Sequence, residues 1–223
     1  NVKRGDSMAG AKKTSSARAV QEMRYTVLPD RMPPLERTKM TAAQKAAADA
    51  MIAGPRGFLT GSYQPILRSP GLMRPLDQVG EYVRFKCKLG LRINEMAAVM
   101  AARHWTQQYE WEAHCRWGRK FGVKQAIIDA IAEGRRPEKM ARDEAVVYDF
   151  FTELFANKSV SDATYARAKT QFGEAGVIDL LGVVGYYTML AMVMNVARTP
   201  AQHGAVLPLT PMPQQMRIRK RSK

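Results

Sequence analysis

The sequence predicts an all-α fold, and three observations support this prediction. Apolar residues recur three and four positions apart, the spacing of one helix face, through most of residues 41–200. Alternation of apolar and polar residues, which is typical of a half-buried strand, is nowhere sustained. With 46% apolar residues, the chain can bury one sizeable core. We therefore expect one helical domain over residues 41–200, preceded by an extended arm (1–40) and followed by a tail (201–223).

The first predicted helix begins at Thr41. Thr41 and Gln44 form a capping-box pattern, an alanine-rich body follows, and Gly54 and Pro55 end the helix. Residues 1–40 contain three prolines and no sustained period, which predicts an extended arm. Between residues 56 and 75, glycine and proline recur every few positions, so we expect an ordered loop with short turns.

Seven further helices are predicted between this loop and residue 196. Their expected ranges are 76–89, 93–104, 107–121, 124–133, 138–157, 161–172 and 175–196. In the fifth of these, one stripe of apolar side chains predicts core packing: Val146, Val147, Phe150, Phe151 and Leu154. Ser161 followed by Asp162 marks a helix start.

The last predicted helix, within residues 175–197, is long and apolar enough to suggest a membrane span. Asp179 and Asn195 interrupt it, and the chain has no second segment of this kind. We expect no membrane span, but a central helix buried on all sides, partly across a subunit boundary. Gly182 and Gly185 in this helix are expected to serve packing, because no strand precedes them as a phosphate loop would require.

The segment QQYEWEAHCRWGRKFGV, residues 107–123, contains the clearest chemical pattern. Glu110 and His114 are four residues apart and therefore lie on one helix face. A carboxylate beside an imidazole can form an acid/base pair. The same spacing also suits a buried hydrogen bond that only satisfies two polar groups in a core.

Around these two residues the chain resembles the carboxymuconolactone decarboxylase family. The characteristic helix of that family reads Glu-Trp-x-x-His, then seven residues, then Gly-Val, and the matching residues are Glu110, Trp111, His114, Gly122 and Val123. The resemblance spans about residues 40–200, with specific motifs only between residues 91 and 123. It implies an alkylhydroperoxidase D-like helical fold and a small homo-oligomer.

The related alkylhydroperoxidase D branch carries a C-x-x-C motif. Its two cysteines would fall on Gln107 and Glu110 of this chain, so the resemblance does not imply a thiol peroxidase. The same branch has a glutamate twelve residues before its first cysteine, and this position is Glu95. Through the resemblance, Glu95 therefore becomes the third member of the expected site.

The resemblance implies that His114, Glu110 and Glu95 carry acid/base chemistry. In the decarboxylation of a small carboxylactone, His114 would deliver a proton to the carbon that loses carbon dioxide. Glu110 would orient His114 or relay the proton, and Glu95 would be a second acid/base group.

A negatively charged substrate would also need cations, for which Arg103 and Arg116 are candidates by their proximity in sequence. Trp111 and His104 complete the expected substrate-binding set. No cofactor is expected. The three histidines of the chain lack metal-ligand spacing, so no metal is expected either.

The net charge of +15 is concentrated at the two ends of the chain. Residues 1–40 hold nine Lys/Arg against four Asp/Glu, or +5, and residues 198–223 hold six Lys/Arg and no acid, or +6. The middle of the chain keeps the remaining +4. Basic arms attract polyanions through counterion release, so residues 1–24 and 212–223 are candidates for contact with RNA or a ribonucleoprotein. Solvated tails or a targeting remnant are the alternative.

The two cysteines, Cys87 and Cys115, are too few for a secreted disulfide framework. No apolar run follows the basic start, so a secretory signal is not expected, and Arg and Ser near the front would suit a mitochondrial presequence. We therefore expect an intracellular, reducing compartment, either the cytoplasm or the mitochondrial matrix. Cys115 is expected to be a small buried residue.

Two functional hypotheses follow. The first is a cofactor-free lyase of the carboxymuconolactone decarboxylase type that acts on a small carboxylic acid or lactone. The second is a catalytically silent relative that serves as a structural subunit of an organellar ribosome or another ribonucleoprotein, with its basic tails on RNA. The first explains the Glu and His residues, and the second explains the tails.

Overall fold

The computed structural model describes residues 29–59, 61–202 and 209. The predicted RNA-contact segments, 1–24 and 212–223, lie outside these residues. Within the described ranges all regular structure is helical and no strand occurs, which confirms the predicted all-α class. The longer helices are α2 (Ala42–Ala53), α4 (Pro70–Glu81), α5 (Leu91–Trp105), α6 (Gln108–Lys120), α7 (Gln125–Glu133), α8 (Arg142–Asn157) and α9 (Asp162–Ala197). Three short elements complete them: a 3-10 helix η1 (Arg37–Lys39), a single turn α3 (Tyr63–Ile66) and a π-helix η2 (Tyr82–Lys86).

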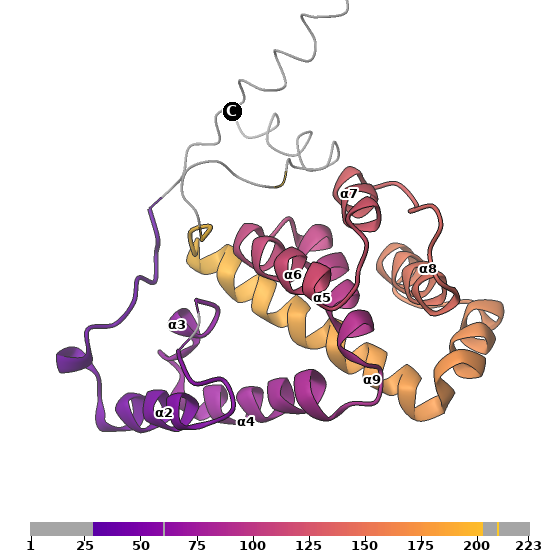
Figure 1. The fold of residues 1–223 in the computed structure, drawn as a ribbon. Helices are drawn as coiled ribbons and strands as arrows, with labels where there is room; N and C mark the ends of the chain where they lie inside the picture. Colours follow the sequence, from indigo (N-terminus) through magenta and orange to yellow (C-terminus); the bar gives the residue numbers. More distant parts are fainter. Residues whose placement is uncertain (1–28, 60, 203–208, 210–223) are drawn as a thin grey trace, which may run out of the picture.

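Helix α5 lies at the centre of the fold. It packs against α6, α7, α8 and α9, and every residue from Ile93 to Arg103 is buried. Figure 1 shows α5 and α6 side by side across the long α9, with α8 beyond them and α4 below. Four alanines give the neighbouring helices room to approach: Ala97, Ala98, Ala101 and Ala102. The middle of the core is therefore built around a helix of small side chains.

Helix α2 has the predicted capping box. The Thr41 hydroxyl accepts from the backbone N–H of Gln44, and the Gln44 side chain accepts from the N–H of Thr41. The helix ends before Gly54, as predicted. The predicted start at Ser161 is also present, because the Ser161 hydroxyl accepts from the N–H of Thr164.

The predicted loop over residues 56–75 is wrong at its end, because α4 already begins at Pro70. Pro70 occupies the first turn, where no intrahelical donor is needed, so it starts the helix instead of excluding it. Pro75 lies inside α4, on its exposed side, where water can satisfy the carbonyl that loses its partner. The predicted helix 76–89 is in fact the end of α4 followed by η2.

A buried polar network holds the loop after α2 to the rest of the domain. Arg56 donates from Nε to Asp77 of α4 at 2.6 Å and from Nη2 to the hydroxyl of Tyr186 of α9 at 2.8 Å. The hydroxyls of Tyr63 and Tyr186 lie 3.0 Å apart. Gly80 of α4 lies against this network, and a side chain there would overlap Arg56 and Tyr186.

Helices α8 and α9 differ from their predicted limits for local reasons. Residues 138–141 are not helical, and α8 begins where the Glu144 carboxylate accepts from the N–H of Ala141. The two predicted helices 161–172 and 175–196 are the two parts of α9, and the kink between them lies at Gly173 (φ 73°, ψ 173°), between the two predicted ranges. Only glycine adopts this backbone conformation readily.

Within the single chain the last helix is not buried on all sides, and the expected burial across a subunit boundary stays a prediction. One face of α9 is open, with Ile178 66% and Val196 59% exposed. Gly182 and Gly185, expected to serve packing, are both exposed, and a Cβ at Gly185 would meet no atom within 4 Å. Among the described residues, α9 is the one helix long and apolar enough to cross a membrane by length and composition, and half of its most apolar stretch is buried inside the protein.

We expect Gly80→Ala to destabilise the fold, because its Cβ would displace the Arg56 guanidinium or the Tyr186 hydroxyl from the buried network. Overpacking of this kind costs about 1–3 kcal/mol of unfolding free energy. Gly71 lies in the same helix, and a Cβ there would meet nothing within 4 Å, so Gly71→Ala is the matched control. It should stay within about 0.5 kcal/mol of the wild type. Urea unfolding of both variants measures the difference, and equal stabilities would contradict this account of the network.

Candidate functional site

A tight connection between α5 and α6 brings the predicted site residues together. Helix α5 ends at Thr106, which has the left-handed conformation (φ 48°), and the Gln107 N–H then donates to the Ala102 carbonyl at 2.8 Å. The Gln107 side chain caps α6 by accepting from the N–H of Glu110 at 2.8 Å. The two helices therefore run back along each other, and residues nineteen positions apart in sequence meet.

The predicted stop at Gly122 and Val123 is present at the other end of α6. Gly122 has a positive φ of 97°, and the Val123 N–H donates back to the Gly118 carbonyl at 2.8 Å. The ideal Cβ position of Gly118 is 3.8 Å from the Glu95 side chain, so this glycine lies where α5 and α6 approach closely. The Gly-Val motif thus ends the helix that carries His114.

His114 and Glu95 form a buried pair. The Nδ1 atom of His114 lies 2.6 Å from a carboxylate oxygen of Glu95, and the residues are 7% and 3% exposed. With the carboxylate accepting, Nδ1 carries a proton, which leaves Nε2 as the nitrogen that can exchange a proton with another group. Glu95 therefore fixes both the orientation and the tautomer of the imidazole. The expectation that Glu110 could orient His114 is not met, because Glu95 occupies that position.

Glu110 is buried without a hydrogen-bond partner for its carboxyl group in the described part of the chain. Both of its side-chain oxygens are inaccessible, and the residue is 2% exposed. Burial disfavours the charged form and raises the pKa of Glu110 well above its ordinary value. Burial therefore favours the protonated form of Glu110, which can donate a proton, one helical turn from His114.

Two neighbours of this site were not predicted. The ring of Tyr187, on α9, meets the His114 ring edge to face with centroids 4.5 Å apart. Burial raises the pKa of the Tyr187 hydroxyl, and Arg84 of η2 opposes this effect through its charge. Arg84 is thus a cation near the buried group, contributed by a π-helix, an element that often marks functional sites. The one signal in the sequence is the Tyr186-Tyr187 pair inside an otherwise apolar helix.

The four predicted substrate-binding residues differ in burial and in surroundings. Trp111 and Arg103 are buried in the core, whereas Arg116 is exposed on α6.

 Each of the two buried residues is 6% exposed. His104 lies on the outer side of α5, where its ring stacks on Phe155 of α8 at 4.1 Å, so it takes no part in the Glu95–His114 pair. The predicted roles of Arg116 and His104 at a buried site are therefore not supported, because both residues face away from it.

Both cysteines are free thiols. Cys115 is 5% exposed, and burial raises its pKa to about 12, so the thiol stays protonated at neutral pH. Cys87 is half-buried, and its Sγ lies 3.1 Å from the Val83 carbonyl oxygen. The described residues contain no group of three or more His, Cys, Asp or Glu side chains that could hold a metal ion.

Comparison with known proteins identifies the fold. No family model matches the chain, and no curated protein matches it. Among solved structures, the chain is similar to the alkylhydroperoxidase D core of an uncharacterised peroxidase-related protein from Ralstonia eutropha JMP134, with a TM-score of 0.64 and 16% sequence identity. The match covers 79% of this chain and 94% of that one. The chain has the alkylhydroperoxidase D-like fold. At this identity the likeness establishes the fold alone, and the predicted fold is confirmed.

We expect Glu110→Gln to change how stability depends on pH. Between the ordinary glutamate pKa and the raised pKa of Glu110, the folded protein holds a proton that the unfolded chain has released. The free energy of unfolding of the wild type should therefore fall as pH rises through this window, by up to about 1.4 kcal/mol per pH unit. Glutamine has no such proton, so Glu110→Gln should lack this contribution. Urea unfolding at several pH values between 4 and 8 measures it.

The exposed Glu138 provides a matched control, because Glu138→Gln makes the same chemical change in contact with water. Its stability should follow the pH profile of the wild type. If Glu110→Gln also ran parallel to the wild type across this range, Glu110 would be ionised in the folded protein and could not be the neutral acid of the site.

Proposed function

We propose that this protein is a cofactor-free acid/base enzyme that resembles carboxymuconolactone decarboxylase and acts on a small carboxylic acid or lactone. The observation that carries the proposal is the buried Glu110 carboxyl group, which has no hydrogen-bond partner among the described residues and lies one helical turn from an imidazole that Glu95 holds. A buried polar group without a partner is unfavourable, and such groups are retained where function needs them. A purely structural Glu-His hydrogen bond would account for Glu95 and His114 but not for Glu110.

The proposed reaction needs only proton transfer. The bond between a substrate carbon and its carboxylate breaks, carbon dioxide leaves, and the electron pair stays on the carbon, which takes up one proton. Nε2 of His114, which carries no proton in the tautomer that Glu95 holds, takes a proton from Glu110 and delivers it to this carbon, and a proton from solvent then restores Glu110. Glu95 keeps the ring oriented throughout. Our candidate for the cation that attracts an anionic substrate is Arg84, because its charge acts on the Tyr187 hydroxyl beside the site.

Thiol peroxidase activity is not part of this proposal. The positions that would carry the C-x-x-C motif hold Gln107, which caps α6, and Glu110. The protonated, buried Cys115 is a poor nucleophile. The peroxidase-related name of the similar solved structure therefore does not transfer to this chain.

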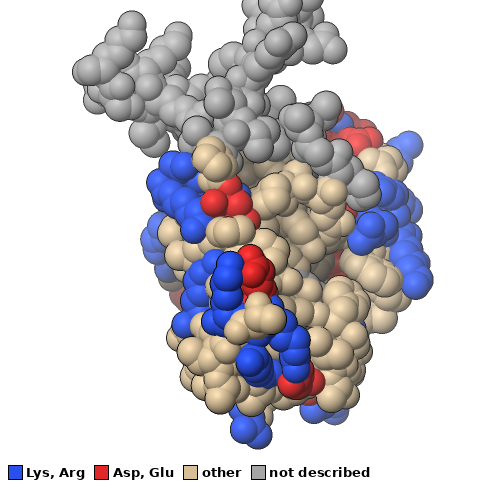
Figure 2. Space-filling model, turned by 90° about the vertical axis from the view of Figure 1, so that its left-hand side faces the viewer, with Lys and Arg blue, Asp and Glu red and all other residues tan. Residues whose placement is uncertain are grey.

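A second function, that of a silent structural subunit in a ribonucleoprotein, is favoured by a different observation. The site is closed in the single chain, since none of Glu95, Glu110 and His114 is more than 7% exposed. A substrate needs an opening to reach it, whereas a structural subunit does not. The face of the folded domain in Figure 2 presents mixed charge, because acidic groups lie among the basic ones. This function therefore depends on the basic segments 1–24 and 212–223.

A small homo-oligomer is part of the enzyme proposal, and α9 offers a surface for it. Six residues of α9 repeat at alternating intervals of four and three along its open side: Ile178, Gly182, Gly185, Met189, Met192 and Val196. This is the spacing of a seam between two packed helices, and the glycines allow close approach.

We place the protein in an intracellular, reducing compartment, consistent with two free cysteines.

We expect His114→Ala to lower the turnover of carboxymuconolactone by at least about 100-fold, because general acid catalysis typically contributes this much. Carbon dioxide release measures turnover, and circular dichroism shows whether the variant remains helical. Cys115→Ser changes a buried neighbour on the same helix and should retain activity. Equal turnover of His114→Ala and the wild type would remove the assignment of the site, and loss of activity in Cys115→Ser would favour thiol chemistry.

The native size of the protein distinguishes the two functions. Sedimentation of a lysate from its own source, with and without ribonuclease, should show a small oligomer that ribonuclease does not alter. Ile178→Lys places a charge on the open face of α9, where the side chain is already exposed, and should convert the oligomer to a monomer. Co-migration with a large particle that ribonuclease disperses would instead favour the structural subunit.

A further inference from the structure

A cleft far from the Glu-His site lies between α8 and the first part of α9. It has a volume of about 420 Å³, within the usual range for small-molecule sites. Its floor is apolar, and its rim holds three arginines, one aspartate and one threonine. None of its lining residues belongs to the acid/base site. We propose that this cleft binds a phosphate monoester group through Arg136, Arg142 and Arg167.

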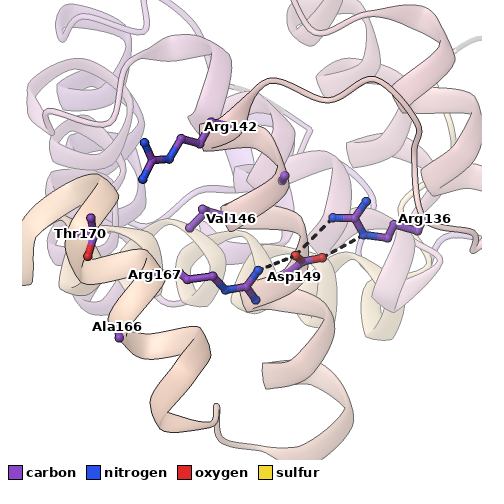
Figure 3. A pocket seen from close by; sticks show the side chains of 8 residues that line it. Arg136, Arg142, Val146, Asp149, Ala166, Arg167 and Thr170 are labelled. Carbon is purple, nitrogen blue, oxygen red and sulfur yellow. Dashed lines mark hydrogen bonds and ion pairs between the residues drawn. The ribbon is translucent and has the colours of Figure 1, made fainter.

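Two of the arginines are held in place by one carboxylate. Arg136 donates from Nε and Nη2 to Asp149 at 3.1 and 3.3 Å, and Arg167 donates from Nη1 to the same carboxylate at 3.1 Å. Arg167 also donates to the Thr164 hydroxyl at 3.3 Å. Figure 3 shows the two guanidinium groups on either side of Asp149. Each guanidinium has five N–H donors, so both keep donors for a ligand.

Arg142 is the third arginine of the cleft. It is the first residue of α8, and within the described part of the chain it makes no hydrogen bond or ion pair. In Figure 3 its guanidinium extends toward the side of the cleft where Thr170 of α9 presents its hydroxyl. An arginine without a protein partner beside two oriented arginines is the arrangement that recognises phosphate oxygens by charge-assisted hydrogen bonds.

The charge of the lining favours a phosphate monoester over a carboxylate. Three arginines and one aspartate give a net charge of +2. A monoester carries close to −2 at neutral pH, whereas a carboxylate or a phosphodiester carries −1. The apolar floor of Ala145, Val146 and Ala166 can contact the uncharged part of the ligand. The group could belong to a small phosphorylated molecule or to the 5′ end of an RNA, and the chemistry of recognition is the same for both.

The test compares binding of adenosine 5′-monophosphate to the full chain and its variants by calorimetry, with adenosine as the phosphate-free control. Arg142→Gln and Arg167→Gln should each weaken binding of the monophosphate by about fivefold or more. Arg74→Gln removes the same charge from the exposed side of α4 and should change the affinity by less than about twofold. Arg142 and Arg74 are both exposed, so unchanged unfolding midpoints are expected for these two variants.

A 10-nucleotide oligouridylate with a 5′-phosphate, compared with its 5′-hydroxyl form, separates the two sources. Dependence of the phosphorylated form on Arg142 supports an RNA end, and dependence of the monophosphate alone supports a small molecule. Equal losses in Arg142→Gln and Arg74→Gln would show general attraction to a basic protein and would overturn the proposal. Failure of the wild type to bind the monophosphate, or equal affinity for adenosine, would overturn it as well.

Discussion

The enclosure of α5 is the constraint on which the rest of this structure depends. A helix packed by neighbours on all sides has no route to water, so its polar side chains must be satisfied within the core or remain unpaired. Asn94 meets this condition through Val83 and Cys87 of the η2 region, and Glu95 meets it through His114. The position of α6 is consistent with this requirement, because it brings His114 beside Glu95.

The same enclosure determines the chemistry of the site. In water, Glu110 would be ionised and His114 would rotate freely. In the core, burial favours the protonated form of Glu110 and Glu95 holds the imidazole, so Glu110 can give a proton that the oriented imidazole can take up. Tyr187 closes this arrangement from α9. The contacts of His114 with Glu95 and Tyr187 therefore serve both the packing of the core and the proposed acid/base function.

The sequence was sufficient where local interactions decide the structure. The capping of α2 by Thr41 and the end of α6 at Gly122 depend on neighbours within a few residues, and both were predicted. The start of α4 was missed because proline breaks a helix interior but favours its first turn, and periodicity alone does not distinguish the two for Pro70. For α9, composition indicated burial but not which face remains open.

The site shows the same division. The spacing of Glu110 and His114 can be read from the sequence of one helix. The partner of His114 depends on how α5 and α6 pack together, so Glu95 was found only through the family resemblance. Tyr187 and Arg84 come from elements distant in sequence, with no pattern that connects them to α6. The arginine cleft was not predicted, because Arg136, Arg142 and Arg167 look like ordinary surface charges until α8 and α9 pack together.

The break at Gly173 bears on how the molecule can change through evolution. Every residue that α9 contributes to the arginine cleft precedes this glycine, and Tyr187 of the acid/base site follows it. In a straight helix both ends share one axis, so a tilt of one end would also tilt the other. Because the helix axis changes direction at Gly173, substitutions that reshape the cleft need not tilt the part of α9 under the Glu-His pair, so the two parts can evolve under separate selection.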